Sequence, residues 1–224
     1  MCGRFTLTID PAELKDAFPE FIFPTQSAPR YNIAPSQPIL VLPNDGSNKA
    51  DFFIWGLIPS WAKDPSIGNR MINARAETLA EKPSFRGPLK YHRCLVFADG
   101  FYEWKAQSTS KSKIPHFIRL KTGSPFVFAG LWDSWHSADG SEVRSATIIT
   151  TTPNELMASI HNRMPVILRN DAYAQWLDPA HQPPGRFHDL LTPYPAEEMQ
   201  AYPVSTLVNS PNNDQLECAV PSGF

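Results

Sequence analysis

The sequence of 224 residues has few cysteines and no long apolar run. Its three cysteines, Cys2, Cys94 and Cys218, cannot all pair, and Cys94 stands in the apolar segment RCLVFA, so we predict a reducing compartment, the cytoplasm. No apolar run approaches the roughly 18 residues of a membrane span, and no signal segment precedes Cys2. We therefore expect no membrane role.

Motifs for metals and nucleotides are also missing. The six histidines and three cysteines lack CxxC or HExxH spacing, and no GxxxxGK or GxGxxG loop occurs, so we predict neither a metal nor a cofactor. The net charge of -2 is unsuited to coating duplex nucleic acid by charge alone. Basic side chains nevertheless predominate over residues 61–93 and acidic ones over 171–224, so a local phosphate-binding surface is possible, although a solvated charged face would explain the same cluster.

The sequence predicts a single domain of the α+β class over residues 2–224. Twenty-three scattered prolines exclude long helices, and Asp10-Pro11 followed by Glu13 predicts a short helix through Phe18. Short β-branched or aromatic runs bounded by turn residues predict a largely antiparallel, curled or barrel-like sheet with peripheral short helices. The predicted strands are 39–42, 51–57, 93–98, 101–106, 116–120, 126–132 and 143–150, and further helices are predicted at 75–81, 152–160, 170–177 and 185–191.

The chain begins MCGRF, and removal of Met1 would give Cys2 a free α-amine. That amine has a pKa of about 7.7–8.0 and the thiol one of about 8.5, so both nucleophiles are partly deprotonated near neutral pH. An incidental cysteine at a frayed terminus is the alternative.

Three polar residues stand where packing alone would not require them. Glu103 lies among the aromatics of ADGFYEW, where burial would raise its pKa and suit it to acid–base catalysis, unless it is an edge-strand glutamate with its head in water. His161 in SIHNRMPVIL can transfer protons near neutral pH or simply cap a helix. Asn73 in MINARAET can orient a substrate oxygen or be a turn amide, and Arg75 can hold a phosphate.

Two tryptophans flank the proline turn of WGLIPSWAKD. Aromatic faces beside cations are typical of single-stranded nucleic acid grooves. Core packing is the better interpretation of Trp55, whereas Trp61, followed by Ala, Lys and Asp, is expected at the surface.

Together the stretches MCGRF, RYNIAP, INARAET, FADGFYEW and IHNRMPVIL resemble the SOS response-associated peptidase (SRAP) family of abasic-site processing proteins. The resemblance extends from Cys2 to the segment VNSPNND and implies the SRAP fold. It also implies an N-terminal cysteine that crosslinks to abasic sites in single-stranded DNA, shielding them at replication forks. We expect a monomer, associated with the nucleoid if the source is bacterial.

The resemblance assigns site residues by position. The family's catalytic positions fall on Cys2, Asn73, Glu103 and His161, and its DNA-contacting positions fall on Arg4 and Arg75, with less secure matches at Trp61, Thr151 and Asn209. Some relatives have paired tryptophans where this chain has Trp61-Ala62, so the base-stacking wedge is expected to be smaller.

The residues allow this chemistry, since an amine adds to an aldehyde and the thiol of the same cysteine can close a thiazolidine ring. Rival functions remain open. A glutamine amidotransferase also begins MCG, but usually continues with a small apolar residue and glycine. The family name suggests a self-processing peptidase, whose leader here would be only Met1. A reader of modified bases would not need Cys2.

Overall fold

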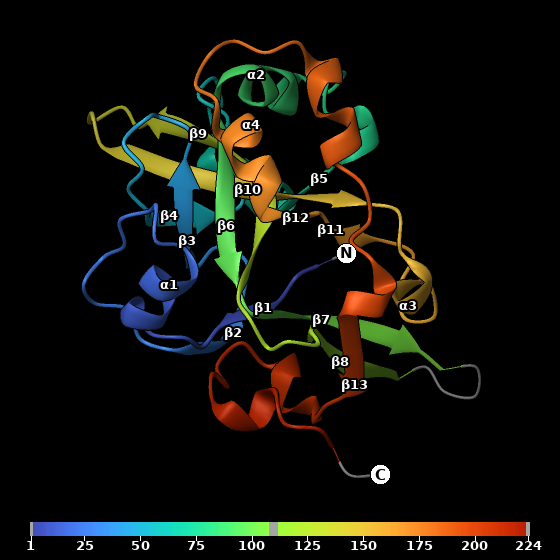
Figure 1. Cartoon of the computed structure of the whole chain (residues 1–224). Helices are drawn as coiled ribbons and strands as arrows, with labels where there is room; N and C mark the ends of the chain where they lie inside the picture. Colours follow the sequence, from blue (N-terminus) through green and yellow to red (C-terminus); the bar gives the residue numbers. More distant parts are fainter. Residues whose placement is uncertain (1, 108–111, 223–224) are drawn as a thin grey trace.

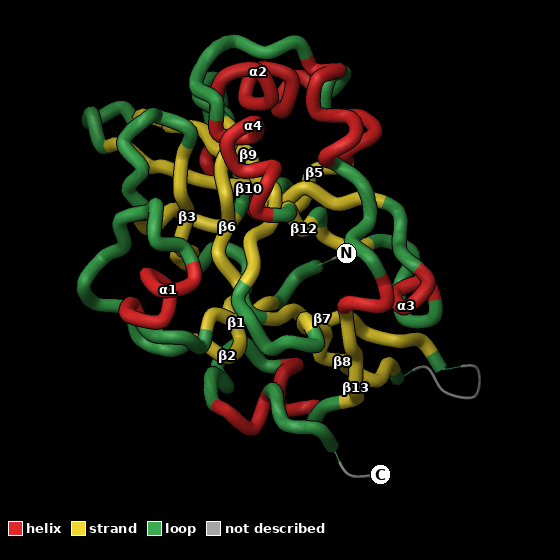
Figure 2. The backbone as a smooth tube through the Cα atoms, viewed as in Figure 1, coloured by secondary structure: helices red, strands yellow, loops and turns green. Residues whose placement is uncertain are grey.

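A closed β-barrel of five strands forms the centre of the molecule in the computed structural model, which describes residues 2–107 and 112–222. Its strands are β3 (Pro38–Pro43), β4 (Asp51–Trp55), β6 (Arg93–Ala98), β9 (Phe126–His136) and β10 (Glu142–Thr151). Antiparallel pairing runs from β4 through β3, β6 and β9 to β10, and a parallel pairing of β10 with β4 closes the ring. Figure 2 shows these strands in yellow.

A second, antiparallel sheet lies against the barrel. Its order is β13 (Met199–Pro203), β8 (Lys113–Leu120), β7 (Gly100–Ala106), β1 (Phe5–Leu7) and β2 (Arg30–Ile33). The chain passes from β6 of the barrel to β7 of this sheet through Asp99 alone. Three short strands extend the barrel wall, namely β5 (Asn73–Arg75), β11 (Met164–Pro165) and β12 (Ile167–Leu168).

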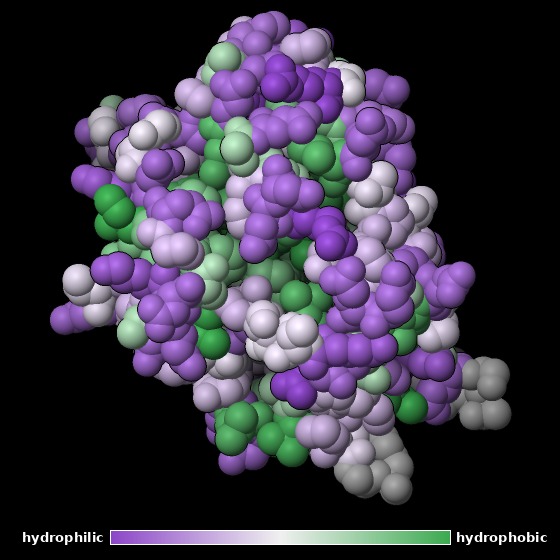
Figure 3. Space-filling view, viewed as in Figure 1, coloured by the Kyte–Doolittle hydropathy of each residue, from purple (hydrophilic) through white to green (hydrophobic). Residues whose placement is uncertain are grey.

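Short helices surround the strands, with α2 and α4 at one end and the C-terminal 3-10 segments at the other (Figure 1). The α-helices are α1 (Pro11–Ala17), α2 (Pro83–Tyr91), α3 (Glu155–Ala158) and α4 (Tyr173–Leu177). The 3-10 segments are Pro65–Arg70, Ala76–Thr78, Asn170–Ala172, Pro184–Leu190, Ala196–Glu198, Thr206–Asn209 and Leu216–Cys218. An apolar cluster lies over the C-terminal segments on an otherwise largely hydrophilic face (Figure 3).

Aromatic packing joins the N-terminal strand to the barrel. The ring of Phe5 in β1 lies edge-on to Trp55 of β4 at 5.1 Å and to Phe128 of β9 at 5.8 Å between centroids. All three side chains are buried. Phe5, three residues after Cys2, is therefore part of the core, and its packing fixes where Cys2 lies.

The predicted fold class is confirmed, and several helix boundaries differ. The predicted helix at 75–81 is wrong, because β5 ends at Arg75 and a 3-10 turn follows, while the nearby helix begins only at Pro83. The segment predicted as a helix at 185–191 is a 3-10 segment. The helix predicted at 152–160 shortens to α3, whose cap is Asn154. Among the described residues, no helix is both long and apolar enough to cross a membrane.

Candidate functional site

Cys2 and Asn73 are in direct contact at the junction of the barrel and the second sheet. The amide nitrogen Nδ2 of Asn73, in β5, donates a hydrogen bond of 2.7 Å to the backbone oxygen of Cys2. This bond fixes the orientation of the amide, and Asn73 Oδ1 is then buried with no hydrogen-bond partner among the described residues. Cys2 itself is fully buried.

Glu103, in β7, faces the same junction. Its side chain is 2% exposed, and burial raises the pKa of its carboxyl from the ordinary 4.5 to about 7. Burial raises the pKa of the Cys2 thiol, and the nearby charge of Glu103 raises it further. The predicted surroundings of Glu103 are confirmed, and the alternative of a glutamate with its head in water is wrong.

His161 completes the cluster from the loop between α3 and β11. Its Nε2 lies 3.9 Å from Glu103 Oε2. His161 Nδ1 faces the backbone of Arg163, at 3.1 Å from its nitrogen and 3.3 Å from its oxygen, while Nε2 faces Glu103. Burial lowers the pKa of His161 and favours the neutral form of the ring. The four predicted catalytic residues therefore lie together, each contributed by a different segment of the chain.

Arg163 is a site residue that the sequence analysis missed. Its guanidinium makes a two-point ion pair with Glu77, with N–O distances of 2.6 and 2.9 Å, and donates a 2.6 Å hydrogen bond to the backbone oxygen of Thr150. It thereby ties the His161 loop to the turn after Arg75. The adjacency of Arg163 to His161 in the sequence was visible, but its partner lies 86 residues away.

Two predicted DNA-contacting residues, Arg4 and Asn209, also make hydrogen bonds within the protein. The guanidinium of Arg4 donates to Asn32 Oδ1 at 2.9 Å, to the backbone oxygen of Val208 at 2.6 Å and to that of Asn209 at 3.2 Å. The side-chain oxygen of Asn209 accepts from the indole of Trp104 at 2.8 Å. These bonds anchor the C-terminal segment beside Cys2, which gives both residues a structural task.

The other three predicted contacts differ in exposure. Arg75 is exposed at the end of β5, two residues from Asn73. Trp61 is 59% exposed, while Trp55 is fully buried, as predicted. Thr151 is only 5% exposed at the end of β10. The side chains of Arg75 and Trp61 are therefore accessible to a DNA strand, whereas that of Thr151 is largely covered.

The loop that carries Trp61 is held firmly by the barrel. Ile58 N donates to Ser145 Oγ at 2.7 Å, Ser60 N donates to Asp133 Oδ2 at 2.9 Å, and the indole of Trp135 donates to Ala62 O at 2.7 Å. The loop begins at Gly56, whose φ of +126° and close approach to the backbone of Gly68 exclude a side chain. The exposed indole of Trp61 is therefore held in a fixed position, where it is available for contact with a ligand.

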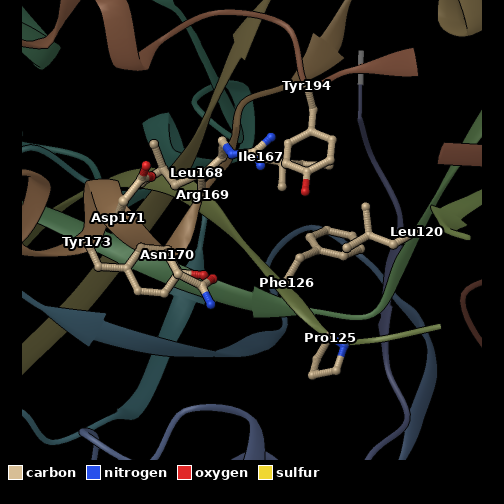
Figure 4. Close-up of a pocket in the computed structure, with 10 residues that line it drawn as sticks. All are labelled: Leu120, Pro125, Phe126, Ile167, Leu168, Arg169, Asn170, Asp171, Tyr173 and Tyr194. Atoms are coloured by element: carbon tan, nitrogen blue, oxygen red, sulfur yellow. The ribbon is translucent and has the colours of Figure 1, made fainter. Parts of the chain in front are cut away.

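Two cavities differ in their relation to the cluster. The pocket in Figure 4, about 380 Å³, lies between β9, β12 and Tyr194 and contains none of the predicted catalytic residues. Arg169 at its rim is paired with Glu198. A second pocket, about 450 Å³, lies between β5 and the start of α2 and includes both Asn73 and Arg75. Of these two pockets, only the second adjoins the cluster of predicted catalytic residues.

All three cysteines are buried and free. Within residues 2–107 and 112–222, no three His, Cys, Asp or Glu side chains are grouped so that they could hold a metal ion.

The sequence matches that of a known family. The family model of the SOS response associated peptidase (SRAP) matches residues 1–211. The chain belongs to this family.

Curated relatives and solved structures agree with this assignment. The chain is 51% identical over 220 residues to "Abasic site processing protein YoqW" of Bacillus subtilis, covering 97% of this chain and 98% of that protein. It is 35% identical to "Abasic site processing protein HMCES" of Gallus gallus, covering 99% and 78%. A crystal structure of a Bacteroides thetaiotaomicron protein superposes with a TM-score of 0.86 at 29% identity, covering 99% of this chain and all of that one.

Proposed function

We propose that this protein processes abasic sites by crosslinking to them. After Met1 is removed, the α-amine of Cys2 attacks the ring-opened aldehyde of an abasic deoxyribose in single-stranded DNA, and the thiol closes a thiazolidine. The crosslink shields the lesion from strand cleavage and error-prone repair. The names of the relatives above support the abasic-site role, and the surroundings of Cys2 support the chemistry.

The observation that carries the proposal is the amide of Asn73. Its Nδ2 holds the Cys2 backbone oxygen, while its buried Oδ1 has no partner among the described residues. A buried acceptor without a donor is costly, by about 1–3 kcal/mol. The α-amine of Cys2 or a hydroxyl of the abasic sugar would supply the missing N–H or O–H, so Asn73 would orient the reacting groups.

The thiol is poorly suited to act first. Activated cysteine nucleophiles have a lowered pKa, whereas burial and the charge of Glu103 raise the pKa of Cys2. The amine, whose ordinary pKa is lower, is therefore the better first nucleophile. Attack by the amine with loss of one water gives an imine, and the thiol then adds across the C=N bond, with sulfur bonding to carbon and the proton going to nitrogen.

Glu103 and His161 would move the protons of these steps. A carboxyl with a pKa of about 7 is present in both protonation states near neutral pH, so it can protonate the departing hydroxyl and accept the thiol proton. His161, whose Nε2 lies 3.9 Å from Glu103 Oε2, would assist in opening the sugar ring and in reversing the link. Closure of the thiazolidine ring removes the electron-poor imine and would thereby also suppress β-elimination.

Denaturing electrophoresis with a single-stranded abasic oligonucleotide tests the proposal. We expect the wild type to give a shifted, heat-resistant band. Cys2→Ser keeps the amine but has no thiol, so its imine adduct should survive only when it is trapped by borohydride. The absence of any shifted band from the wild type, with Met1 shown by mass spectrometry to be removed, would overturn the proposal.

The rival functions give different results. A glutamine amidotransferase would release ammonia from glutamine in a glutaminase assay, with no DNA adduct. A self-processing peptidase would cleave its own leader at a rate that depends on Glu103 and His161. A non-covalent reader of modified bases would bind equally well without Cys2.

A further inference from the structure

We infer that the pocket beside Asn73 binds the nucleobase next to the abasic sugar. This site rests on the proposed function, because the pocket gains a nucleobase only if Cys2 holds the sugar. Its walls come from β5, the following turn and the first turn of α2, and its lining residues are Met71, Asn73, Arg75, Thr78, Lys82, Pro83, Ser84 and Phe85.

The position of the pocket relative to the chemistry is fixed by Asn73. This residue lines the pocket and also bonds to the backbone of Cys2 at 2.7 Å. A sugar attached to Cys2 would therefore have the pocket beside it. The only bases that the strand brings there are those of the two neighbouring nucleotides, because the abasic residue has none.

The lining has the character that a base requires. Met71 and Phe85 are half-buried, and Pro83 adds a further apolar surface at the start of α2. A flat base can stack on such a surface without any hydrogen-bond readout, so the pocket would accept every base. Its volume of about 450 Å³ falls within the range of about 300–1,000 Å³ typical of small-ligand pockets.

Charge at the rim matches the phosphates of the same nucleotide. Arg75 and Lys82 are both exposed and line the pocket, one at the end of β5 and the other just before α2. The first turn of α2 adds the positive end of a helix dipole. A pocket lined by apolar side chains and two exposed cations suits a nucleotide, with its base inside and its phosphates on the cations.

The test combines a protein change with a DNA change. The DNA carries a tetrahydrofuran abasic analogue, which has no aldehyde and cannot crosslink, and affinity is measured by fluorescence anisotropy. In two further oligonucleotides, the base on the 5′ or the 3′ side of the analogue is also removed. For the wild type we expect loss of one of these bases to weaken binding about 5- to 150-fold, the range of one base–aromatic stack.

The protein variants locate that effect. Phe85→Ala should weaken binding of the intact oligonucleotide by a similar factor and should then be insensitive to removal of the same base. Because Phe85 also packs against the core, Phe85→Leu provides a second variant that keeps apolar volume without an aromatic face. The matched control is Tyr91→Ala, a 53% exposed aromatic at the far end of the same helix, which should leave Kd unchanged.

Three outcomes decide the inference. Loss of base dependence in the Phe85 variants supports it. Equal affinity of the wild type for all oligonucleotides would overturn it. So would independent effects, in which base removal weakens binding by the same factor in Phe85→Leu as in the wild type. Failure of the proposed crosslinking is recognised separately, as the absence of a heat-resistant band with a true abasic site.

Discussion

Burial raises the pKa of Glu103 to about 7, from the 4.5 usual for glutamate. Between these two values the folded protein binds a proton that the unfolded chain does not. Stability from this group is therefore full below pH 4.5 and is lost as the pH rises through 7. We expect Glu103→Gln to raise the free energy of unfolding by about 1–3 kcal/mol at pH 8 and to change it little at pH 4.

Urea unfolding at several pH values checks this expectation, with crosslinking rates measured on the same samples. The rate should fall by about 10²–10⁴ in Glu103→Gln, since acid–base help is typically worth that factor, while DNA affinity changes little. A variant that is no more stable at pH 8 than the wild type would show that the carboxylate is well solvated in the fold. Unchanged kinetics would make Glu103 a structural residue.

The sequence predicted some of these residues better than others. The burial of Glu103 could be predicted because aromatic residues flank it on both sides, and the exposure of Trp61 because polar residues follow it. Arg163 could not be found, because its task depends on Glu77, which is distant in sequence. The resemblance implies that Arg4 contacts DNA, but its position in the sequence does not reveal that its guanidinium also donates to three acceptors of the protein. A charged side chain in a sequence does not reveal whether the fold itself uses it.

Asn32 in β2 clamps the C-terminal segment to the second sheet. Its buried Nδ2 donates to the backbone oxygens of Val208, Ser210 and Asn213 at 3.2, 2.9 and 2.7 Å. We expect Asn32→Ala to lower the free energy of unfolding by about 1–3 kcal/mol, because buried carbonyls lose their donor.

Chemical unfolding, with protease cleavage as a second readout, measures this change. Asn212→Ala, in the same segment but exposed, is the control and should have little effect. Because Asn32 also accepts from Arg4, its loss should loosen the surroundings of Cys2 and slow crosslinking. Equal stability of the two variants would contradict the role of this clamp.

Most of the helices and strands that were predicted correctly have local signals in the sequence. The cap Asp10 with Pro11 and Glu13 forms the complete capping box of α1. Helix α2 was missed because Gly87 and Pro88 interrupt its second half, although Pro83 stands at its start. β1 and β2 were missed because strands of three or four residues carry too little alternation to be recognised.

Closure of the barrel is a property of the whole molecule. The strand sequences predict a curled sheet, but closure depends on the parallel pairing of β10 with β4, in which Ser145 lies opposite Ile54, 91 residues earlier in the chain. The same closure brings β5, β7 and the His161 loop together around Cys2. No local pattern specifies such long-range contacts, so the cluster became visible in the sequence only through the family resemblance.

The charge distribution over the molecule predicts a preference for single strands. An acidic net charge with a local cationic region and an exposed indole favours unpaired bases over duplex. Arg75→Ala should flatten the salt dependence of binding, changing the log–log slope by roughly 0.7 for one lost phosphate contact. Lys121→Ala, an exposed cation after β8, is the control and should leave the slope unchanged. Tighter binding of intact duplex at matched salt would contradict the preference.

The most direct test of the account is to block the amine of Cys2 while leaving its thiol intact. A variant carrying uncleaved residues before Cys2 has an amide nitrogen there, which is not nucleophilic. Incubated with a single-stranded abasic oligonucleotide and heated in denaturant, it should give no stable adduct, while the protein with a free Cys2 amine gives a heat-resistant band. A heat-stable DNA adduct from the blocked variant would contradict the thiazolidine mechanism and assign the reaction to the thiol alone.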